Sequence, residues 1–203
     1  MDTLKYILKK YKIDSSQNSP ITLECNRLTD LPLLFNELKF KKGAEIGVLG
    51  GVYSEILCRS NPDLKLYSID AWQFYPLKKN FRRARHYPPI YEEAINRLGQ
   101  YPNNTIIKKW SMDALKDIKD GSLDFVFIDA DHRYESVTAD IAGWSKKVKK
   151  GGIVSGHDYS VRSEYVQVHE AVNAWTKKYN IEPWFILKSP INRNETSWMW
   201  VKT

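Results

Sequence analysis

The feature that most constrains the fold is a regular alternation, from residue 44 onward, between short apolar segments and segments whose apolar residues recur at helical spacing. The apolar segments lie at 44–49, 64–70, 105–109, 124–129 and 152–157. The helical patterns between and after them lie at 53–59, 78–98, 112–118, 134–148 and 165–179. Short apolar strands that alternate with helices are typical of a parallel sheet covered by helices on both faces. The sequence therefore predicts an α/β fold with a mostly parallel, doubly wound sheet.

The two ends of the chain depart from this alternation. Two strand-like segments, 183–188 and 197–201, are joined by about eight residues, and so short a link favours an antiparallel pair. Residues 1–42 contain two helical patterns separated by a cluster of breakers at 14–20. We expect seven strands, the last of them antiparallel, in a domain at 43–203. Residues 1–42 are expected to form an N-terminal helical cap over the ligand-binding edge of the sheet.

Composition limits the class of protein. The chain has 203 residues, of which 42% are apolar and 27% charged, as expected for one globular domain. Each apolar stretch is far shorter than the ~20 residues of a membrane-spanning helix, which argues against an integral membrane protein. Lysines interrupt the first twelve residues, unlike a secretory signal. Cys25 and Cys58 lack the spacing of a zinc site and fit a reducing compartment, so the cytoplasm is the expected location.

The formal net charge is +7, and part of it is concentrated in one segment. Residues 78–86 carry five lysines and arginines beside aromatic residues: Lys78, Lys79, Arg82, Arg83 and Arg85. Such a segment can attract phosphate or nucleic acid, but a basic run is more often a solvated helix face. Both interpretations stay open at this point.

A glycine-containing turn follows the first strand of the alternating region. The segment reads Glu45-x-Gly47-x-x-x-Gly51 between a buried strand and a helix, and glycines at such a turn let the backbone approach a ligand. The dinucleotide pattern GxGxxG would need a glycine where this chain has Leu49, and no phosphate loop ending in Gly-Lys-Ser/Thr is present. NAD and ATP are therefore disfavoured as ligands. A tight strand–helix connection with no ligand is the alternative.

A carboxylate ends the second strand of the region. Asp70 comes 23 residues after Gly47, where an acid can accept hydrogen bonds from both hydroxyls of a ribose. Asp70 could otherwise cap the following segment. Trp72 could stack on a base or pack in the core. The combination of turn and acid favours a ligand that contains a nucleoside.

Further ionisable residues follow two later strands. Asp129, Asp131 and His132 come directly after the strand at 124–129. His157 and Asp158 end the strand that begins at the glycine pair 151–152. Because the carboxyl ends of parallel strands lie along one edge of the sheet, these side chains should meet there. Burying them without a partner or a task would be costly.

This ordered set of motifs resembles the class I S-adenosylmethionine-dependent methyltransferases over residues 43–203. It is similar to the small-molecule O-methyltransferase branch, which includes the catechol, caffeoyl-CoA and antibiotic-sugar enzymes. The resemblance implies a Rossmann-like sheet and an enzyme that transfers a methyl group from S-adenosylmethionine to a small-molecule acceptor, with oxygen as the expected nucleophile. It also implies that acids after the fourth and fifth strands bind a divalent metal ion.

The resemblance assigns roles to individual residues. Glu45, Gly47 and Gly51 would hold the methionine part of the cofactor. Asp70 with its neighbours Ala71 and Trp72 would face the nucleoside, and Ser111 and Met112 would contact adenine. Asp129 would complete the pocket. The metal ligands would be Asp129, His157 and Asp158. A histidine ligand would favour manganese, iron or zinc over magnesium, and His157 could instead be no ligand at all. His132 and His157 are the candidate general bases.

Two other functions stay open. An RNA methyltransferase would use the basic segment 78–86, and a non-catalytic protein would bind S-adenosylmethionine without transferring the methyl group. The expected partner is a small-molecule acceptor rather than a membrane or nucleic acid, and a homodimer is left open. The acceptor, the metal and the pathway cannot be identified from the residues.

Overall fold

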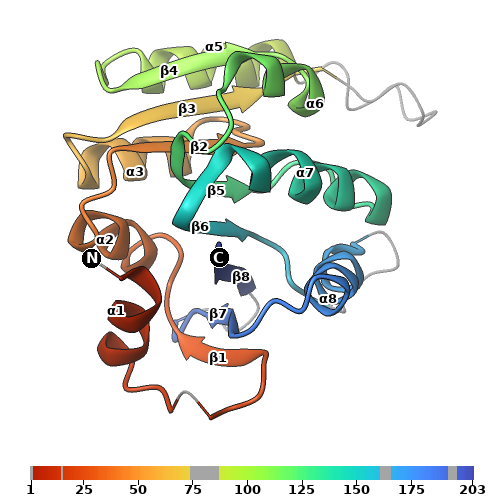
Figure 1. Ribbon diagram of the computed structural model, residues 1–203. Helices are drawn as coiled ribbons and strands as arrows, with labels where there is room; N and C mark the ends of the chain where they lie inside the picture. Colours follow the sequence, from red (N-terminus) through yellow and green to blue (C-terminus); the bar gives the residue numbers. More distant parts are fainter. Residues whose placement is uncertain (1, 15, 74–86, 161–165, 192–195) are drawn as a thin grey trace.

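A single mixed sheet forms the centre of the protein. The computed structural model describes residues 1–203 except 1, 15, 74–86, 161–165 and 192–195 (Figure 1). The strand order is β1-β7-β8-β6-β5-β2-β3-β4. The strands are β1 (Ile21–Glu24), β2 (Lys42–Ile46), β3 (Lys65–Asp70), β4 (Asn104–Lys108), β5 (Leu123–Ile128), β6 (Val148–Gly156), β7 (Trp184–Lys188) and β8 (Thr196–Val201).

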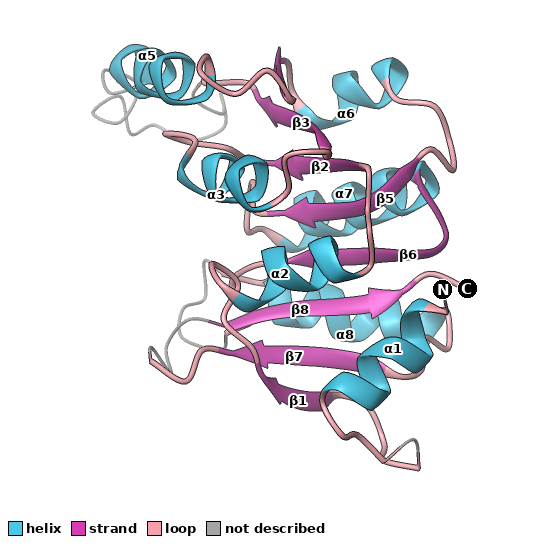
Figure 2. Cartoon of the chain, turned by 90° about the vertical axis from the view of Figure 1, so that its left-hand side faces the viewer, coloured by secondary structure: helices cyan, strands magenta, loops and turns pink. Residues whose placement is uncertain are grey.

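Helices cover both faces of this sheet (Figure 2). They are α1 (Thr3–Lys10), α2 (Asp30–Glu37), α3 (Val52–Ser60), α5 (Tyr87–Leu98), α6 (Ser111–Ala114), α7 (Tyr134–Lys147) and α8 (Val168–Lys178), with a 3₁₀ turn at Leu115–Asp117. Helices α1, α2, α3 and α5 lie on one face, and α6, α7 and α8 lie on the other. No helix in the described ranges is long and apolar enough to cross a membrane.

The predicted class of fold is confirmed. β8 runs antiparallel to its neighbours β6 and β7, and the other pairs are parallel. The carboxyl ends of β2, β3, β5 and β6 therefore lie along one edge, which we call the carboxyl edge. The basic segment 78–86 lies outside the described residues. The description of the chain resumes at α5, which follows this segment.

The predicted strand count and the predicted cap are corrected by β1. The sheet has eight strands rather than seven, because Ile21–Glu24 pairs in parallel with β7, from Ile21 beside Phe185 to Glu24 beside Lys188. Residues 1–42 are therefore not a purely helical cap. Only four residues alternate between buried and exposed, which is too short a pattern to identify a strand without its partner.

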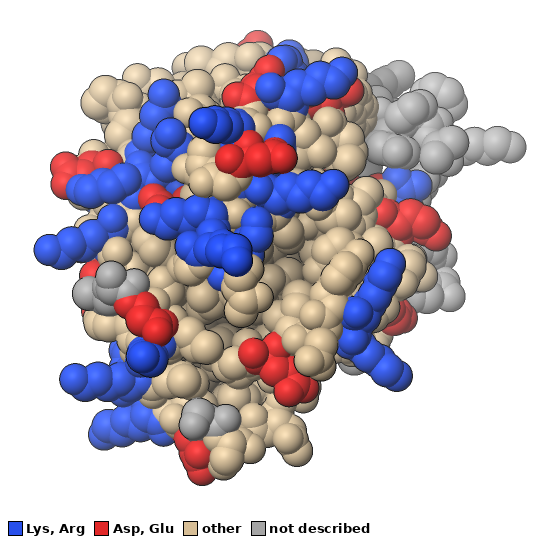
Figure 3. All heavy atoms as spheres, in the orientation of Figure 1, with Lys and Arg blue, Asp and Glu red and all other residues tan. Residues whose placement is uncertain are grey.

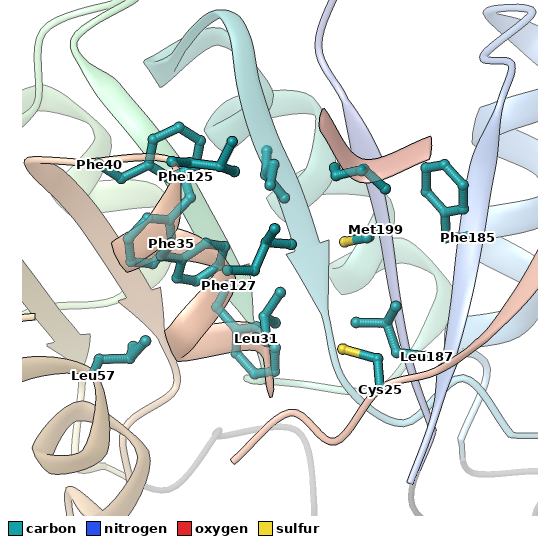
Figure 4. Packing of buried hydrophobic residues seen from close by; sticks show 14 of the residues in the cluster. Cys25, Leu31, Phe35, Phe40, Leu57, Phe125, Phe127, Phe185, Leu187 and Met199 are labelled. Atoms are coloured by element: carbon teal, nitrogen blue, oxygen red, sulfur yellow. The ribbon is translucent and has the colours of Figure 1, made fainter. Parts of the chain in front are cut away.

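The helices of the N-terminal segment pack on a sheet face rather than over the carboxyl edge. The Thr3 hydroxyl donates to the carbonyl of Gly151 near the amino end of β6 (2.6 Å). In α2, Phe35 is fully buried and stacks on Phe125 of β5, with ring centroids 4.0 Å apart (Figure 4). Burying two phenylalanines stabilises the fold by a few kcal/mol, roughly 1.5–3 for each side chain. This contact holds α2 against the central strand β5.

Candidate active site

The glycine turn between β2 and α3 lies directly against the end of β5. Gly47 has a φ of +90°, and a Cβ added there would lie 2.2 Å from the carbonyl oxygen of Asp129. Gly51 has a φ of +82° and is the N-cap of α3. Glycine is needed at both positions for conformation, and at Gly47 also for space. The structure therefore brings the predicted turn and the predicted acid of β5 into contact.

Asp70 fixes the shape of this turn. One carboxylate oxygen accepts from the backbone N–H groups of Val48 (2.9 Å) and Leu49 (3.1 Å). The other oxygen accepts from the N–H of Trp72 (2.7 Å). A carboxylate has about four acceptor directions, so the same group can also accept from a ribose hydroxyl. Asp70 thus lies where the sequence analysis expects it, with an additional structural role.

Of the two roles that the sequence leaves open for Trp72, the structure favours packing in the core over stacking on a base. Its side chain is buried, packs against the ring of Tyr91 with centroids 4.8 Å apart, and donates from Nε1 to the carbonyl of Leu49 (2.8 Å). The alternative of core packing is what the structure contains. Ala71 is buried beside it. The strand-end position alone could not tell an aromatic ring that faces a ligand from one that turns inward.

The two residues predicted near adenine have different surroundings. Ser111 donates from its hydroxyl to the carboxyl group of Asp140 and accepts from Nε1 of Trp144 (2.8 Å), so its side chain links α6 to α7. Met112 is 48% exposed. Only Met112 of this pair offers an open apolar side chain to a ligand.

Glu45 lies beneath the turn rather than in an open pocket. Its carboxyl group is buried and accepts from the hydroxyl of Ser54 on α3, which also contacts the hydroxyl of Ser68 (2.6 Å). Burial raises the pKa of Glu45 to about 8, while the hydrogen bond from Ser54 acts in the opposite direction. A neutral Glu45 at pH 7 joins β2 to α3. Direct contact between Glu45 and the cofactor stays a prediction.

We expect Glu45 to make unfolding depend on pH. A carboxyl group whose pKa is raised in the folded state stabilises the fold most below its unfolded pKa, and this contribution is lost as the pH rises through about 8. The stability of the wild type relative to Glu45→Gln should therefore fall by roughly 2–4 kcal/mol between pH 5 and pH 9. Urea unfolding at several pH values measures this. Glu24→Gln, on an exposed position of β1, is the control. Parallel profiles for wild type and Glu45→Gln would contradict the assignment.

Four ionisable side chains meet at the carboxyl ends of β5 and β6. His132 Nε2 lies 3.4 Å from Oδ1 of Asp129 and 3.2 Å from Oδ2 of Asp158. His157 Nδ1 lies 3.3 Å from Oδ1 of Asp158 and 3.8 Å from Oδ2 of Asp129. The structure thus brings together all four residues predicted to form the reaction centre. We call Asp129, His132, His157 and Asp158 the acidic edge cluster.

The electrostatics of the cluster favour charged forms. The hydrogen bond with Asp129 raises the pKa of His132, and the charge of Asp158 acts in the same direction against desolvation. The hydrogen bond with His157 lowers the pKa of Asp158. Asp158 also has a φ of +54°, a left-handed conformation that costs roughly 1 kcal/mol outside glycine and is typical of functional sites.

The set of side chains that fits a cation differs from the predicted one. One side-chain oxygen or nitrogen atom from each of Asp129, His132 and Asp158 lies within 4.8 Å of the other two. In the described part of the chain, this is the only group of three potential metal ligands that lie so close together. His132 thus replaces His157 in the ligand set predicted from the sequence. The family resemblance implied His157, which directly precedes Asp158. No sequence pattern shows how the turn after β5 folds back and brings His132 to these carboxylates.

One further residue at this edge was missed by the sequence analysis. The guanidinium of Arg27, between β1 and α2, lies 5.4 Å from the centre of the Tyr53 ring in the first turn of α3. No motif surrounds Arg27, so only the pairing of β1 with β7 could have placed it here.

Comparison with known proteins identifies the family. Residues 44–159, more than half of the chain, match the family described as a methyltransferase domain. The chain belongs to this methyltransferase family. The match begins within β2 and ends just after Asp158, so it contains the glycine turn and the whole acidic edge cluster. The predicted membership of a methyltransferase family is confirmed.

Individual relatives of this methyltransferase are distant. A curated protein of Sinorhizobium fredii named uncharacterized protein y4gI is 31% identical over 98 residues, which are 47% of this chain and only 10% of that protein. Cofactor-bound Rv0187 from MTB has a TM-score of 0.64 at 16% identity, covering 98% of this chain and 89% of that one. The O-methyltransferase from Bacillus cereus in complex with SAH has a TM-score of 0.62 at 18% identity, covering 100% and 91%. At these identities the two structures show a shared fold.

Proposed function

We propose that this methyltransferase transfers a methyl group from S-adenosylmethionine to an oxygen atom of a small molecule, assisted by a divalent cation at the acidic edge cluster. The observation that carries the proposal is the contact between the glycine turn and the backbone of Asp129, because a turn suited to the cofactor then lies next to a cluster whose groups could deprotonate a hydroxyl group. The B. cereus protein, which is described as an O-methyltransferase, supports the choice of an oxygen acceptor.

The residues of the turn fit S-adenosylmethionine. The positive φ of Gly47 and Gly51 gives the turn a tight backbone conformation that other residues rarely adopt, and Asp70 presents a half-buried carboxylate to the same turn. Met112 adds an exposed apolar side chain for an adenine ring. Bound at the turn, the cofactor supplies a methyl group that its sulfonium already activates. The protein then has mainly to position the acceptor in line with the carbon–sulfur bond.

The cluster fits a cation by the chemistry of its donors. Asp129 and Asp158 supply carboxylate oxygens, and His132 supplies an imidazole nitrogen, a mixed set that suits manganese or iron better than magnesium. Bound there, such a cation would supply Lewis-acid activation of the acceptor hydroxyl. His157 remains beside Asp158, where its Nδ1 orients that carboxylate.

Binding of the product tests the cofactor assignment directly. S-adenosylhomocysteine should bind the wild type with micromolar affinity, and Asp70→Ala should weaken this by roughly 1–3 kcal/mol, because Asp70 both holds the turn and can accept from the ribose. Isothermal titration calorimetry measures the change. Asp63→Ala removes the same charge from an exposed side chain far from the turn and should bind like the wild type. If Asp70→Ala binds as tightly as Asp63→Ala, the ribose assignment is wrong.

The acceptor class can be sought separately, with methyl-labelled cofactor and a panel of hydroxyl compounds.

The face of the protein drawn in Figure 3 gives little support to a nucleic-acid substrate. Figure 3 shows lysine and arginine side chains with acidic side chains between them, rather than an uninterrupted basic face. Lys41 pairs with Asp63 (2.8 Å), and Lys147 pairs with Asp120 (2.6 Å). The small-molecule assignment is therefore preferred. The cytoplasmic location and a homodimer stay predictions from the sequence.

A further inference from the structure

The turn after β1 brings the N-terminal segment to the carboxyl edge. β1 runs parallel to β7. Because β7 and β6 are both antiparallel to β8, β7 and therefore β1 run in the same direction as β6. Residue 27 therefore lies at the same edge as Asp158. Neither the family match, which begins at residue 44, nor any motif covers this turn.

Hydrogen bonds of Asn26 make this turn rigid. Its backbone N–H donates to the carboxylate of Asp30 (2.7 Å), and its side-chain oxygen accepts from the N–H of Leu28 (2.7 Å). Its side-chain NH₂ donates to the hydroxyl of Ser189 at the end of β7 (3.2 Å). Asn26 itself is 7% exposed. The backbone of Arg27 is thus held in place before any ligand binds, which lowers the entropy cost of using its side chain.

The guanidinium of Arg27 lies beside the amino end of α3. It is 5.4 Å from the ring centre of Tyr53, the second residue after Gly51. Tyr53 is 4% exposed, and within the described part of the chain its buried hydroxyl has no hydrogen-bond partner. A buried hydroxyl without a partner costs stability unless a ligand satisfies it. The first N–H groups and the positive dipole end of α3 add to the preference for an anion here.

Charges at the two sides of the glycine turn are opposite. The backbone of Asp129 lies against Gly47, and its carboxylate belongs to the acidic edge cluster, whereas Arg27 lies over Tyr53 beyond Gly51. The amino-acid part of S-adenosylmethionine carries an ammonium group and a carboxylate, which match these two signs. We propose that Arg27 binds the carboxylate of the methionine part of the cofactor, with the Tyr53 hydroxyl as a second donor. This inference rests on the proposed use of S-adenosylmethionine.

The charge of Arg27 acts on both the glycine turn and the acidic edge cluster. It opposes the rise in the pKa of Glu45, which is due mainly to burial, and it helps to lower the pKa of Asp158. Glu45 and Tyr53 both belong to the strand–turn–helix unit that carries the glycine turn. An arginine fork can make two parallel hydrogen bonds to a carboxylate, which gives both affinity and orientation.

The test compares two ligands that differ in the group in question. S-adenosylhomocysteine carries the amino-acid carboxylate, and 5′-methylthioadenosine lacks the whole amino-acid part. By calorimetry, Arg27→Gln should bind S-adenosylhomocysteine about 10–100-fold more weakly than the wild type, and 5′-methylthioadenosine almost equally well. Tyr53→Phe, which keeps the ring, should lose affinity for S-adenosylhomocysteine alone. Arg59→Gln removes the same charge from an exposed position on α3 and should change neither affinity.

Other results would overturn the inference. If Arg27→Gln loses equal affinity for both ligands, Arg27 only supports the fold. If Arg27→Gln binds S-adenosylhomocysteine like the wild type but has a raised KM for the acceptor, Arg27 belongs to the acceptor site. If Arg27→Gln melts below the assay temperature, Arg27→Lys replaces it and should lose affinity selectively for S-adenosylhomocysteine. Failure of the wild type itself to bind S-adenosylhomocysteine would refute the proposed function, a result distinct from a failure of Arg27 alone.

Discussion

Replacing Asp158 by alanine is expected to lower the rate of methyl transfer by about 10²–10⁴-fold while changing the affinity for S-adenosylhomocysteine only slightly. The reason is geometric. Asp158 contacts both His132 and His157 but lies outside the glycine turn, so its loss disrupts the acidic edge cluster and leaves the cofactor-binding turn intact. Single-turnover transfer from labelled cofactor, with calorimetry on the same variant, measures both quantities.

A chelator separates the two ways in which the cluster can act. With a bound cation, chelation should abolish transfer in the wild type, and manganese should restore it in the wild type but not in Asp158→Ala. His132→Ala should then lose affinity for manganese. If chelation has no effect while His157→Ala lowers the rate by about 10²–10⁴-fold, the cluster acts as a histidine–carboxylate base and the cation assignment is wrong. Full activity in Asp158→Ala would remove the reaction from this edge altogether.

Replacing Gly47 by alanine is expected to abolish measurable cofactor binding and to lower the free energy of unfolding by roughly 2–5 kcal/mol. The added Cβ would lie 2.2 Å from the carbonyl oxygen of Asp129 and 2.7 Å from Cα of Ala130, so β5 and the turn would have to separate. Urea unfolding and calorimetry with S-adenosylhomocysteine measure the two effects.

Gly121 provides a matched control for this prediction. It also has a positive φ, +64°, but a Cβ added there would meet no atom within 4 Å. Gly121→Ala should therefore cost only the left-handed conformation, roughly 1–2 kcal/mol, and should bind the cofactor normally. Equal losses of stability in both variants would show that conformation, rather than contact with Asp129, accounts for the need for glycine at position 47.

The class of fold and the place of the site could be predicted because they depend on local patterns. Apolar segments of five or six residues between helices predict a parallel sheet, and a parallel sheet brings the ends of its strands to one edge whatever their exact order. Gly47, Asp70, Asp129 and Asp158 therefore met as expected. No distance between them was needed for that prediction, only the direction of the strands.

The sequence could not determine which way individual side chains turn. Trp72 follows Asp70 as a stacking residue would, yet its indole packs against Tyr91. Glu45 begins the glycine motif, yet its carboxyl group is buried beneath the turn against Ser54. Both orientations depend on which helix covers that part of the sheet, and neither α3 nor α5 is near these residues until the chain has folded.

Contacts between distant parts of the chain were decided by the tertiary structure alone. β1 has four residues and is recognisable only through its pairing with β7, and that pairing delivers Arg27 to the carboxyl edge. His132 joins Asp129 and Asp158 because the turn after β5 folds back toward the end of β6. The sequence by itself determined a mostly parallel sheet and the edge at which its polar strand ends meet, since periodicity and strand direction are local properties. Which residues complete the site depended on strand pairing and packing, which no local pattern encodes.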